Sequence, residues 1–441
     1  MYFSRDIIKA LNVWKNKPRS KPLILQGARQ VGKTYLLKQF GRDSFENTAY
    51  FNFEKQVGLK QFFSATKEPR EILTQLALVN GAPIHPERTL IIFDEIQECI
   101  AALNALKYFN EETPDYKIAC AGSLLGVAMA RGASFPVGKV DFMKLHPLSF
   151  VEFLAVADPA LVTYLDSIEK IEAIPDIFFN PLKEKLKMYF ISGGMPEAVT
   201  ALLELQDVAA TQEVLYNIVN AYRLDFTKHV ENKDIQKIYH IWDSLPSQLA
   251  RENKKFLYQT IKTGARAREY EDALNWLVNA GLVYKIHACS KPTLPLSAYD
   301  DLSSFKVYLH DVGLLRRLSL LDPVVYADGN RLIGEFKGAL AENFILSGLS
   351  RQFEGLPRYW RSGNRAEIDF LIQHRNCIIP VEVKSDENIK SRSLSEYRKH
   401  FAPELSLRFS LRNLKKDEGF INLPLFMVDY AKRFIERETL Q

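Results

Sequence analysis

Cysteine is scarce in this chain, and its spacing argues against several classes of protein. The 441 residues contain four cysteines, and no two of them form a C-x-x-C pair. A structural zinc site or a disulfide-rich scaffold would need closer spacing. We therefore expect the four side chains to be reduced thiols in the core of a cytosolic protein: Cys99, Cys120, Cys289 and Cys377.

Long apolar runs and a strong charge bias are also missing. No segment approaches the roughly 18 uninterrupted apolar residues of a membrane-spanning helix, and residues 1–6 lack the apolar run of a signal peptide. The net charge of +5 is small for this length, so it permits nucleic acid as a partner without arguing for it. The expected location is cytoplasmic, with no membrane partner.

The chain does contain a complete phosphate-binding loop. An apolar strand pattern at 23–25 leads into G-x-x-x-x-G-K-T at 27–34, and a helical pattern follows. The glycines let backbone N–H groups face phosphate oxygens, Lys33 reaches the β- and γ-phosphates, and the Thr34 hydroxyl ligates magnesium. The helix adds its positive N-terminal end. The sequence thus predicts that ATP and magnesium bind here, with these residues lining the site: Gly27, Ala28, Arg29, Gln30, Val31, Gly32, Lys33, Thr34 and Tyr35.

Two later strands supply acidic and polar groups for the same site. The run 89–95 has four consecutive apolar residues followed by Asp94 and Glu95, which fits a buried parallel strand that ends in acids. We expect Asp94 to hold the magnesium and Glu95 to polarise the attacking water. Ser123 follows a third strand, at 117–121; it either senses the γ-phosphate or caps a helix.

Five motifs, in order, resemble a family of prokaryotic AAA-type ATPases whose members carry a C-terminal domain of unknown function. They are GARQVGKT (27–34), FDEIQ (93–97), AGS (121–123), LHPLSFVEF (145–153) and GGMPEA (193–198). The resemblance implies an ATPase. Such ATPases often place an arginine shortly before the fourth motif, where this chain has Gly138 and Lys139, and lysine lacks the bidentate fork. The nearest arginine is Arg131, so ring formation stays open.

The middle of the chain has a helical pattern from 183 to about 249. Arg223 there is either part of a structural ion pair or faces the nucleotide. Residues 255–310 combine short helices with two strand patterns, at 282–286 and 305–309, which is typical of a winged helix. Basic residues precede its periodic helix and acidic residues follow, so nucleic-acid binding and a structural role remain equal alternatives: Lys262, Arg266, Arg268, then Glu269, Glu271 and Asp272.

The C-terminal part predicts a second site. A helix at 334–349 carries Glu342, and the segments 358–372 and 377–384 resemble the core of PD-(D/E)XK nucleases. A two-residue turn at 375–376, with Asn376 tolerating positive φ, would place Asp369 opposite Glu382 as a close, non-hydrogen-bonded pair.

This pair suggests metal chemistry. Two adjacent carboxylates repel each other unless a cation lies between them, and magnesium prefers oxygen ligands. Lys384 would then orient water or stabilise developing charge, with Glu342 as an outer ligand. A charged edge of a sheet is the simpler alternative. Nearby basic residues either face solvent or contact nucleic-acid phosphates: Lys390, Arg392, Arg398 and Lys399.

We therefore predict an α/β protein of three domains: a P-loop ATPase domain with a parallel sheet at 1–200, a helical and winged-helix domain at 201–325, and a restriction-endonuclease-like domain at 326–441. The predicted function is ATP hydrolysis coupled to a magnesium-dependent nuclease-like domain that acts on nucleic acid, DNA rather than RNA. The alternative is an ATP-dependent binding or signalling module with a silent nuclease-like domain. A homo-oligomer is compatible with either.

Overall fold

The computed structural model describes residues 1–123, 125–130, 138–229, 232–251, 253–323, 334–363, 366–385 and 392–439. Contacts divide the chain into two compact units. The N-terminal unit comprises residues 4–146 and 279–282, and the larger unit comprises residues 1–3, 147–278 and 283–441. Each unit is described by itself below.

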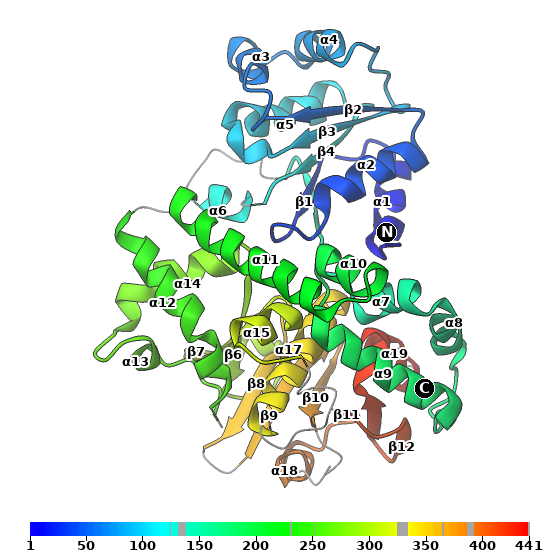
Figure 1. Cartoon of the computed structure of the whole chain (residues 1–441), viewed down its shortest axis with the longest axis vertical. Coiled ribbons are helices and arrows are strands. Elements are labelled where there is room, and N and C mark those ends of the chain that lie inside the picture. The colour runs from blue at the N-terminus through cyan, green and yellow to red at the C-terminus, as the bar shows by residue number, and fades with distance from the viewer. Residues whose placement is uncertain are drawn as a thin grey trace. The chain divides into compact units, whose positions relative to one another are not determined.

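A five-stranded parallel sheet forms the centre of the N-terminal unit (Figure 1). Its order is β2-β3-β4-β1-β5, with β1 at Leu23–Gln26, β2 at Asn47–Asn52, β3 at Thr89–Asp94, β4 at Lys117–Ala121 and β5 at Asp141–Lys144. Every residue of β3 and β4 is buried, as expected for strands covered on both faces. Because β4 lies between β1 and β3, its carboxyl end, which leads to Ser123, lies between the phosphate loop after β1 and Asp94 at the end of β3.

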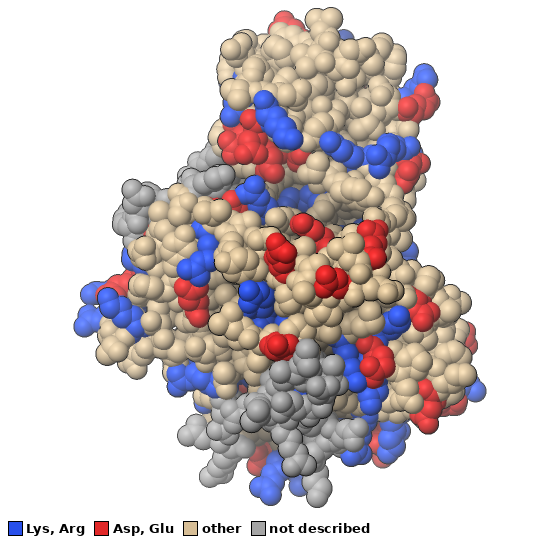
Figure 2. Space-filling model, viewed as in Figure 1, with Lys and Arg blue, Asp and Glu red and all other residues tan. Residues whose placement is uncertain are grey.

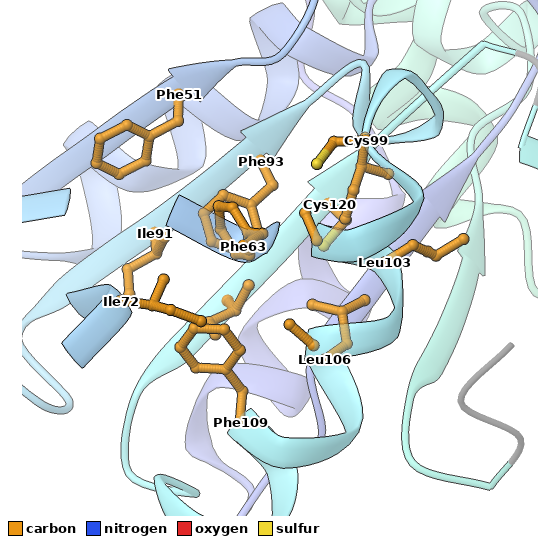
Figure 3. Close-up of a cluster of buried hydrophobic side chains, with 14 of the residues drawn as sticks. Phe51, Phe63, Ile72, Ile91, Phe93, Cys99, Leu103, Leu106, Phe109 and Cys120 are labelled. Carbon is orange, nitrogen blue, oxygen red and sulfur yellow. The ribbon is translucent and has the colours of Figure 1, made fainter. Parts of the chain in front are cut away.

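Helices connect these parallel strands and supply the core. They are α1 (Ile7–Asn16), α2 (Lys33–Ser44), α3 (Leu59–Ala65), α4 (Pro69–Asn80), η1 (Ile96–Glu98), α5 (Ile100–Glu112) and α6 (Leu125–Ala130). The α1 helix is amphipathic, with Leu11 and Trp14 buried. In the main core, four phenylalanines pack mostly edge to face around Phe93: Phe51, Phe53, Phe63 and Phe109. Figure 3 shows Phe51, Phe63, Phe93 and Phe109 in this cluster. This core holds the acidic end of β3 in place.

The larger unit begins with helices, and the sequence pattern predicts those between residues 183 and 249. These are α7 (Phe150–Ala157), α8 (Pro159–Ser167), α9 (Asp176–Ser192), α10 (Pro196–Glu204), α11 (Val208–His229), α12 (Asn232–Leu249), α13 (Tyr258–Ile261), α14 (Ala267–Asn279), α15 (Val312–Leu318) and α17 (Gly334–Gln352). The last residue of α14 belongs to the N-terminal unit. Helices α18 (Arg392–Phe401) and α19 (Ala431–Thr439) follow near the C-terminus, with 3-10 turns η2 (Leu296–Tyr299) and η4 (Leu425–Tyr430).

An eight-stranded mixed sheet completes the larger unit. Its order is β12-β13-β11-β10-β9-β8-β6-β7. The strands are β6 (Val283–Cys289), β7 (Asp300–Leu309), β8 (Arg358–Ser362), β9 (Ala366–His374), β10 (Cys377–Val383), β11 (Ser406–Ser410), β12 (Lys415–Asp417) and β13 (Phe420–Pro424). The α/β fold class is thus confirmed: a parallel-sheet P-loop-like part, a helical middle and a mixed-sheet C-terminal part.

The two-stranded ribbon predicted for a winged helix is present but is not a separate wing. Strands β6 and β7 pair antiparallel, and β6 also pairs in parallel with β8 through Ala288 with Tyr359 and Cys289 with Trp360. The ribbon therefore forms one edge of the C-terminal sheet, and the predicted boundary at 325/326 falls inside that sheet. A strand pattern reveals a ribbon, but it does not say which further strand the ribbon will pair with.

The hairpin register predicted between β9 and β10 is confirmed. His374 lies opposite Cys377, and the ladder continues to Phe370 opposite Val381, in the register that would bring Asp369 and Glu382 together at the following position. The turn differs in one detail, because the left-handed residue is Arg375, at φ 53°, rather than Asn376.

Two of the five motifs stabilise the helices of the larger unit. Ser149 and Glu152 form a reciprocal capping box at the start of α7, which explains the LHPLSFVEF motif. The Gly194 N–H donates to the buried Asp311 carboxylate at 2.7 Å, and a Cβ on Gly193 would lie 2.2 Å from that carboxylate. Only glycine allows this close approach, so the GGMPEA motif joins α9 and α10 to the start of α15.

The surface and the cysteines agree with the composition. On the face drawn in Figure 2, acidic and basic side chains are interspersed. Three cysteines are buried free thiols, whereas Cys377 is partly exposed. In the described ranges, no helix is both long and apolar enough to cross a membrane.

Candidate nucleotide site and a C-terminal carboxylate cluster

The phosphate loop depends on glycine at two positions. A Cβ on Gly27 would lie 2.3 Å from the carbonyl oxygen of Leu145, which follows the neighbouring strand β5. Gly32 precedes α2 with φ at 94°, a conformation that residues with a side chain rarely adopt. Gln30 also has positive φ, at 66°. The sequence thus folds into a tight turn whose next residue, Lys33, begins the helix.

A buried arginine and a buried lysine brace this loop from inside. Arg5 donates to the carbonyl oxygens of Val31 at 3.2 Å and His146 at 2.6 Å. Lys33 is 7% exposed, and its Nζ donates to the carbonyl oxygens of Gly27 at 2.9 Å and Ala28 at 2.8 Å. Burial lowers the pKa of Lys33 to about 8. The ammonium group is therefore poorly solvated and would gain from an anionic partner.

Asp94 meets Thr34 at the carboxyl end of the sheet. The Thr34 hydroxyl lies 3.1 Å from each carboxylate oxygen of Asp94. Tyr50 donates to the same carboxylate at 2.7 Å and Asn52 at 3.3 Å, both from the adjacent strand β2. Burial and the bond to Asp94 raise the pKa of Tyr50 to about 12, so the phenol keeps its proton and donates. This hydroxyl and carboxylate fit the ligand set that magnesium prefers.

Glu95, the predicted base, occupies an unusual backbone conformation. Its φ is 50° and its ψ 45°, in the left-handed region. One carboxylate oxygen, Oε2, accepts from Gln97 Nε2 at 2.5 Å and lies 3.4 Å from the Ser123 hydroxyl. The acid is thus oriented by side chains from η1 and from the end of β4. A non-glycine residue held in this conformation at a strand end is the kind of strain that occurs at functional sites.

The second predicted site is a cluster of buried carboxylates in the larger unit. Glu342 of α17 and Glu382 of β10 are 4% and 3% exposed. Asp369 of β9 accepts from the Val383 N–H at 2.7 Å. Burial, reinforced by Glu342 and Glu382, raises the pKa of Asp369 well above its ordinary value. The Oε2 atom of Glu382 is buried without a hydrogen-bond partner.

Lysines neutralise most of this cluster. Lys384 lies 2.6 Å from Glu382 Oε1, as its i+2 spacing predicts. Two further lysines come from earlier segments: Lys254 lies 2.6 Å from Glu342 Oε1, and Lys306, which is fully buried, lies 2.5 Å from Glu367. Although burial opposes it, Lys254 and Lys306 bring the pKa of Glu342 below its ordinary value.

Tyr308 completes the surroundings of Glu342, donating to Oε2 at 2.8 Å. Within the ranges that the structure describes, no group of three acidic, histidine or cysteine side chains is placed to hold a metal ion. The predicted metal ligands Glu342, Asp369 and Glu382 therefore lie in one region without forming a ready metal cage.

Other predicted residues have plain structural partners or fall outside the description. Lys139 pairs with Glu111 at 2.9 Å, and Arg223 pairs with Asp243 at 2.6 Å, the structural alternative for that arginine. Lys262, Arg266 and Arg268 are exposed. The helix α18 carries Arg392, Arg398 and Lys399. Arg131 and Lys390 lie outside the described residues.

Sequence reasoning missed several residues of these sites. Tyr50 and Asn52 are on β2, and only the pairing of this strand with β3 brings them to Asp94. Gln97 stands in the FDEIQ motif and could have been found there. Arg5, Lys254, Lys306 and Tyr308 act across long sequence separations and give no local signal.

Family models match three successive parts of the chain. Residues 19–154 match a family described as an AAA domain. This stretch contains the loop, Asp94, Glu95 and Ser123. This part of the chain is therefore similar to AAA domains and is called the AAA domain below. Residues 183–324 and 337–427 match two families described only as domains of unknown function, DUF8612 and DUF4143. The carboxylate cluster draws Lys254, Lys306 and Tyr308 from the first of these and its acids from the second.

Several solved structures resemble the chain at low identity. A Walker-type ATPase of Pyrococcus abyssi is 15% identical over 72% of this chain and 96% of its own, with a TM-score of 0.46. The RuvB Holliday junction branch migration motor of Thermotoga maritima is 12% identical over 67% and 91%, at 0.29. Cdc6p of Pyrobaculum aerophilum is 11% identical over 75% and 97%, at 0.26. No curated protein matches the chain.

Proposed function

We propose that the AAA domain binds and hydrolyses ATP with magnesium. The observation that supports this most directly is the meeting of Thr34 and Asp94 at 3.1 Å beside a buried lysine whose charge lacks an acidic partner in the loop itself. A hydroxyl, a carboxylate and an ammonium group at one sheet edge are the three protein groups that a magnesium–triphosphate needs. The loop residues 27–35 would surround the phosphates.

Each side chain of the site has a separate role in the proposed hydrolysis. Lys33 exchanges its carbonyl contacts for the β- and γ-phosphate oxygens, and its charge offsets the charge that develops there. Bound magnesium supplies charge neutralisation between the phosphates. Glu95 accepts a proton from the attacking water, and Ser123 lies close enough to Glu95 to contact the γ-phosphate region. Asp94 accepts from the Thr34 hydroxyl and orients it.

Replacing Lys33 by alanine tests this proposal. We expect ATP turnover to fall to background, because the loop loses the ammonium group that would offset the negative charge of the β- and γ-phosphates. Lys9→Ala, which removes an exposed lysine of α1, is the matched control and should hydrolyse ATP at the wild-type rate. Phosphate release by purified protein is the measurement. Equal rates for Lys33→Ala and Lys9→Ala would overturn the proposal.

A second function is favoured by the carboxylate cluster, namely magnesium-dependent cleavage of nucleic acid. Asp369 and Glu382 occupy adjacent register positions on neighbouring strands, Lys384 follows two residues later, and Glu382 Oε2 is buried without a partner. A buried, unpartnered carboxylate oxygen is costly and is explained if it faces a cation in the working state. Glu342 would be an outer ligand. DNA is the preferred substrate class over RNA.

Cleavage can be tested separately from ATP turnover. Asp369→Asn and Lys384→Ala should abolish nicking of duplex, single-stranded or branched DNA in magnesium or manganese while leaving ATPase activity intact. Asp417→Asn, on the exposed strand β12 of the same sheet, is the control and should cut like the wild type. A wild-type protein that cuts none of these substrates, nor RNA, fails the cleavage half of the proposal.

The alternative is an ATP-dependent binding or signalling module with a silent C-terminal domain. It is favoured by the lysines that already neutralise Glu342, Glu367 and Glu382. It predicts that Asp369→Asn changes neither partner binding nor any phenotype. The division into domains at 1–200, 201–325 and 326–441, self-association into an oligomer and the contact of Lys262, Arg266 and Arg268 with DNA remain parts of the proposal. These possibilities are separated by measuring ATPase rates with and without DNA and RNA and by analysing the same samples on gels for cleavage.

A further inference from the structure

We propose that Gln97 is a positioning residue for Glu95, and that Gly122 exists in this chain to make room for it. The inference rests on the proposed ATP hydrolysis and names how its base is held. Two of the resembling motifs contribute: FDEIQ provides both Glu95 and Gln97, and AGS provides Gly122 and Ser123.

The contact between Gln97 and Glu95 has one chemically sensible orientation. Gln97 Nε2 lies 2.5 Å from Glu95 Oε2. An ionised carboxylate only accepts hydrogen bonds, so the amide must turn its NH₂ group, not its oxygen, toward Glu95. The amide oxygen of Gln97 therefore points the other way, where it is buried without a hydrogen-bond partner.

Leaving that oxygen without a partner costs free energy, which indicates that the contact to Glu95 is maintained at the expense of stability. A glutamine with no other duty would be replaced at low cost by an apolar residue of the same length. The orphaned oxygen thus argues for a role of the NH₂ group.

Gly122 lies beside the amide oxygen of Gln97, on the side away from Glu95. A Cβ there would lie 2.2 Å from Gln97 Oε1 and 2.8 Å from a Leu125 carbon. The φ of Gly122 is not among the positive values of the chain, so its backbone does not need glycine. Space for Gln97 and Leu125 is what excludes a larger residue. Glycine at this position is explained by the glutamine side chain packed on it.

Both donors reach the same oxygen of Glu95. Gln97 and Ser123 bond Oε2, whereas Oε1 receives neither bond. With Oε2 held and the backbone of Glu95 fixed at φ 50°, the direction of Oε1 is set before water arrives. Such preorganisation raises the rate of proton abstraction and has little effect on nucleotide affinity.

Substitutions of Gln97 test the idea. Gln97→Met keeps the length and removes the donor, and we expect kcat to fall roughly 10- to 100-fold, the range that one hydrogen bond to a charged group covers. The affinity for a fluorescent ATP analogue should stay within about twofold of wild type, since Gln97 bonds the proposed base rather than the phosphate loop. Gln97→Glu should be worse than Gln97→Met because a second carboxylate would face Glu95. Gly122→Ala, which displaces Gln97 without altering it, should reduce kcat in the same way.

A double-substitution cycle separates positioning from a general structural role. If Gln97 acts through Glu95, then Gln97→Met has no further effect on the single-turnover rate of the Glu95→Gln protein. Effects that multiply, or a wild-type kcat in Gln97→Met, would overturn the positioning role while leaving ATP hydrolysis established. A parallel loss of nucleotide affinity in Gln97→Met would overturn it as well. A wild-type protein without ATPase activity overturns both proposals.

Discussion

The acidic side chains of the two sites have different kinds of partner: neutral donors in the first site and lysines in the second. In the AAA domain, Asp94 and Glu95 accept hydrogen bonds from neutral hydroxyl and amide donors. In the C-terminal cluster, Glu342, Glu367 and Glu382 are each bonded by a lysine. A neutral donor orients a carboxylate, whereas an ammonium group also competes with any cation for it. Under the proposed function, the first site would receive a dication without losing an ion pair, whereas the second site would first have to give one up.

The largest expected effect tests the base of the first site. Glu95→Gln should lower kcat by roughly 100- to 10,000-fold, the usual contribution of a general base, while nucleotide binding persists. Rapid-quench measurements of a single turnover provide the rate. Glu382→Gln, the same chemical change in the second site, should leave ATPase activity unchanged. If the two substitutions affect ATP turnover equally, the contrast between the sites does not hold.

The next effect concerns the ion pair of Lys254. Lys254→Met leaves the buried Glu342 without its closest cation, which costs about 3–5 kcal/mol of stability in EDTA. Magnesium should restore much of this loss in the variant but add little to the wild type, because it would take the vacated position. Thermal unfolding with EDTA and with magnesium measures both. The double variant Lys254→Met, Glu342→Gln should lose the response to magnesium; a magnesium effect equal in all three proteins would contradict the competition.

A smaller effect follows from the lowered pKa of Lys33. At pH below about 8 the free ammonium group is charged, and nucleotide binding needs no proton. Above that pH the free protein is increasingly neutral at Lys33, but the bound polyanion favours the charged form, so binding takes up a proton. Affinity for an ATP analogue should therefore fall by up to about tenfold per pH unit above 8. Calorimetric titration provides the affinity.

The control for this pH effect is Lys33→Arg, whose side chain stays charged throughout. Its weaker binding should not change between pH 8 and 10. A parallel decline in both proteins would assign the pH dependence to other groups.

The smallest expected effect tests the neutral donors around Asp94. Tyr50→Phe removes one hydrogen bond to a carboxylate oxygen that retains the Thr34 and Asn52 contacts. A net contribution of about 0.5–1.5 kcal/mol corresponds to a roughly 2- to 10-fold fall in kcat/KM. Steady-state kinetics at saturating magnesium measures it. No change at all would mean that Asp94 does not depend on its neutral donors.

Local pattern was sufficient for much of the fold and for the first site. The loop, the acidic strand end and the polar end of β4 are all encoded by short segments, and parallel strands bring their carboxyl ends to one edge. The pairing of Asp369 with Glu382 followed from counting residues back from a two-residue turn. These are short-range deductions in which each residue constrains its neighbours.

Contacts between residues far apart in the chain could not be predicted from the sequence. Lys254 meets Glu342 across 88 residues and Lys306 meets Glu367 across 61, and nothing in either neighbourhood specifies the partner. The same holds for β6, whose pattern predicts a ribbon but not its parallel pairing with β8. Gln97 could have been found in the FDEIQ motif, but its packing against Gly122 could not be predicted from the sequence.

The pairing of β6 with β8 bears on how this chain can be divided or recombined. A fragment starting at residue 326 would keep the acids of the cluster but lose β6 and β7, Lys254 and Tyr308. It would present β8 as a bare edge, and it would remove Cys289 and Leu296 from the apolar core that they share with Trp360. An uncovered edge pairs readily with other chains. The predicted boundary at 325/326 is therefore a poor place to divide the chain. A C-terminal domain moved to another protein without β6 and β7 would lack part of its sheet.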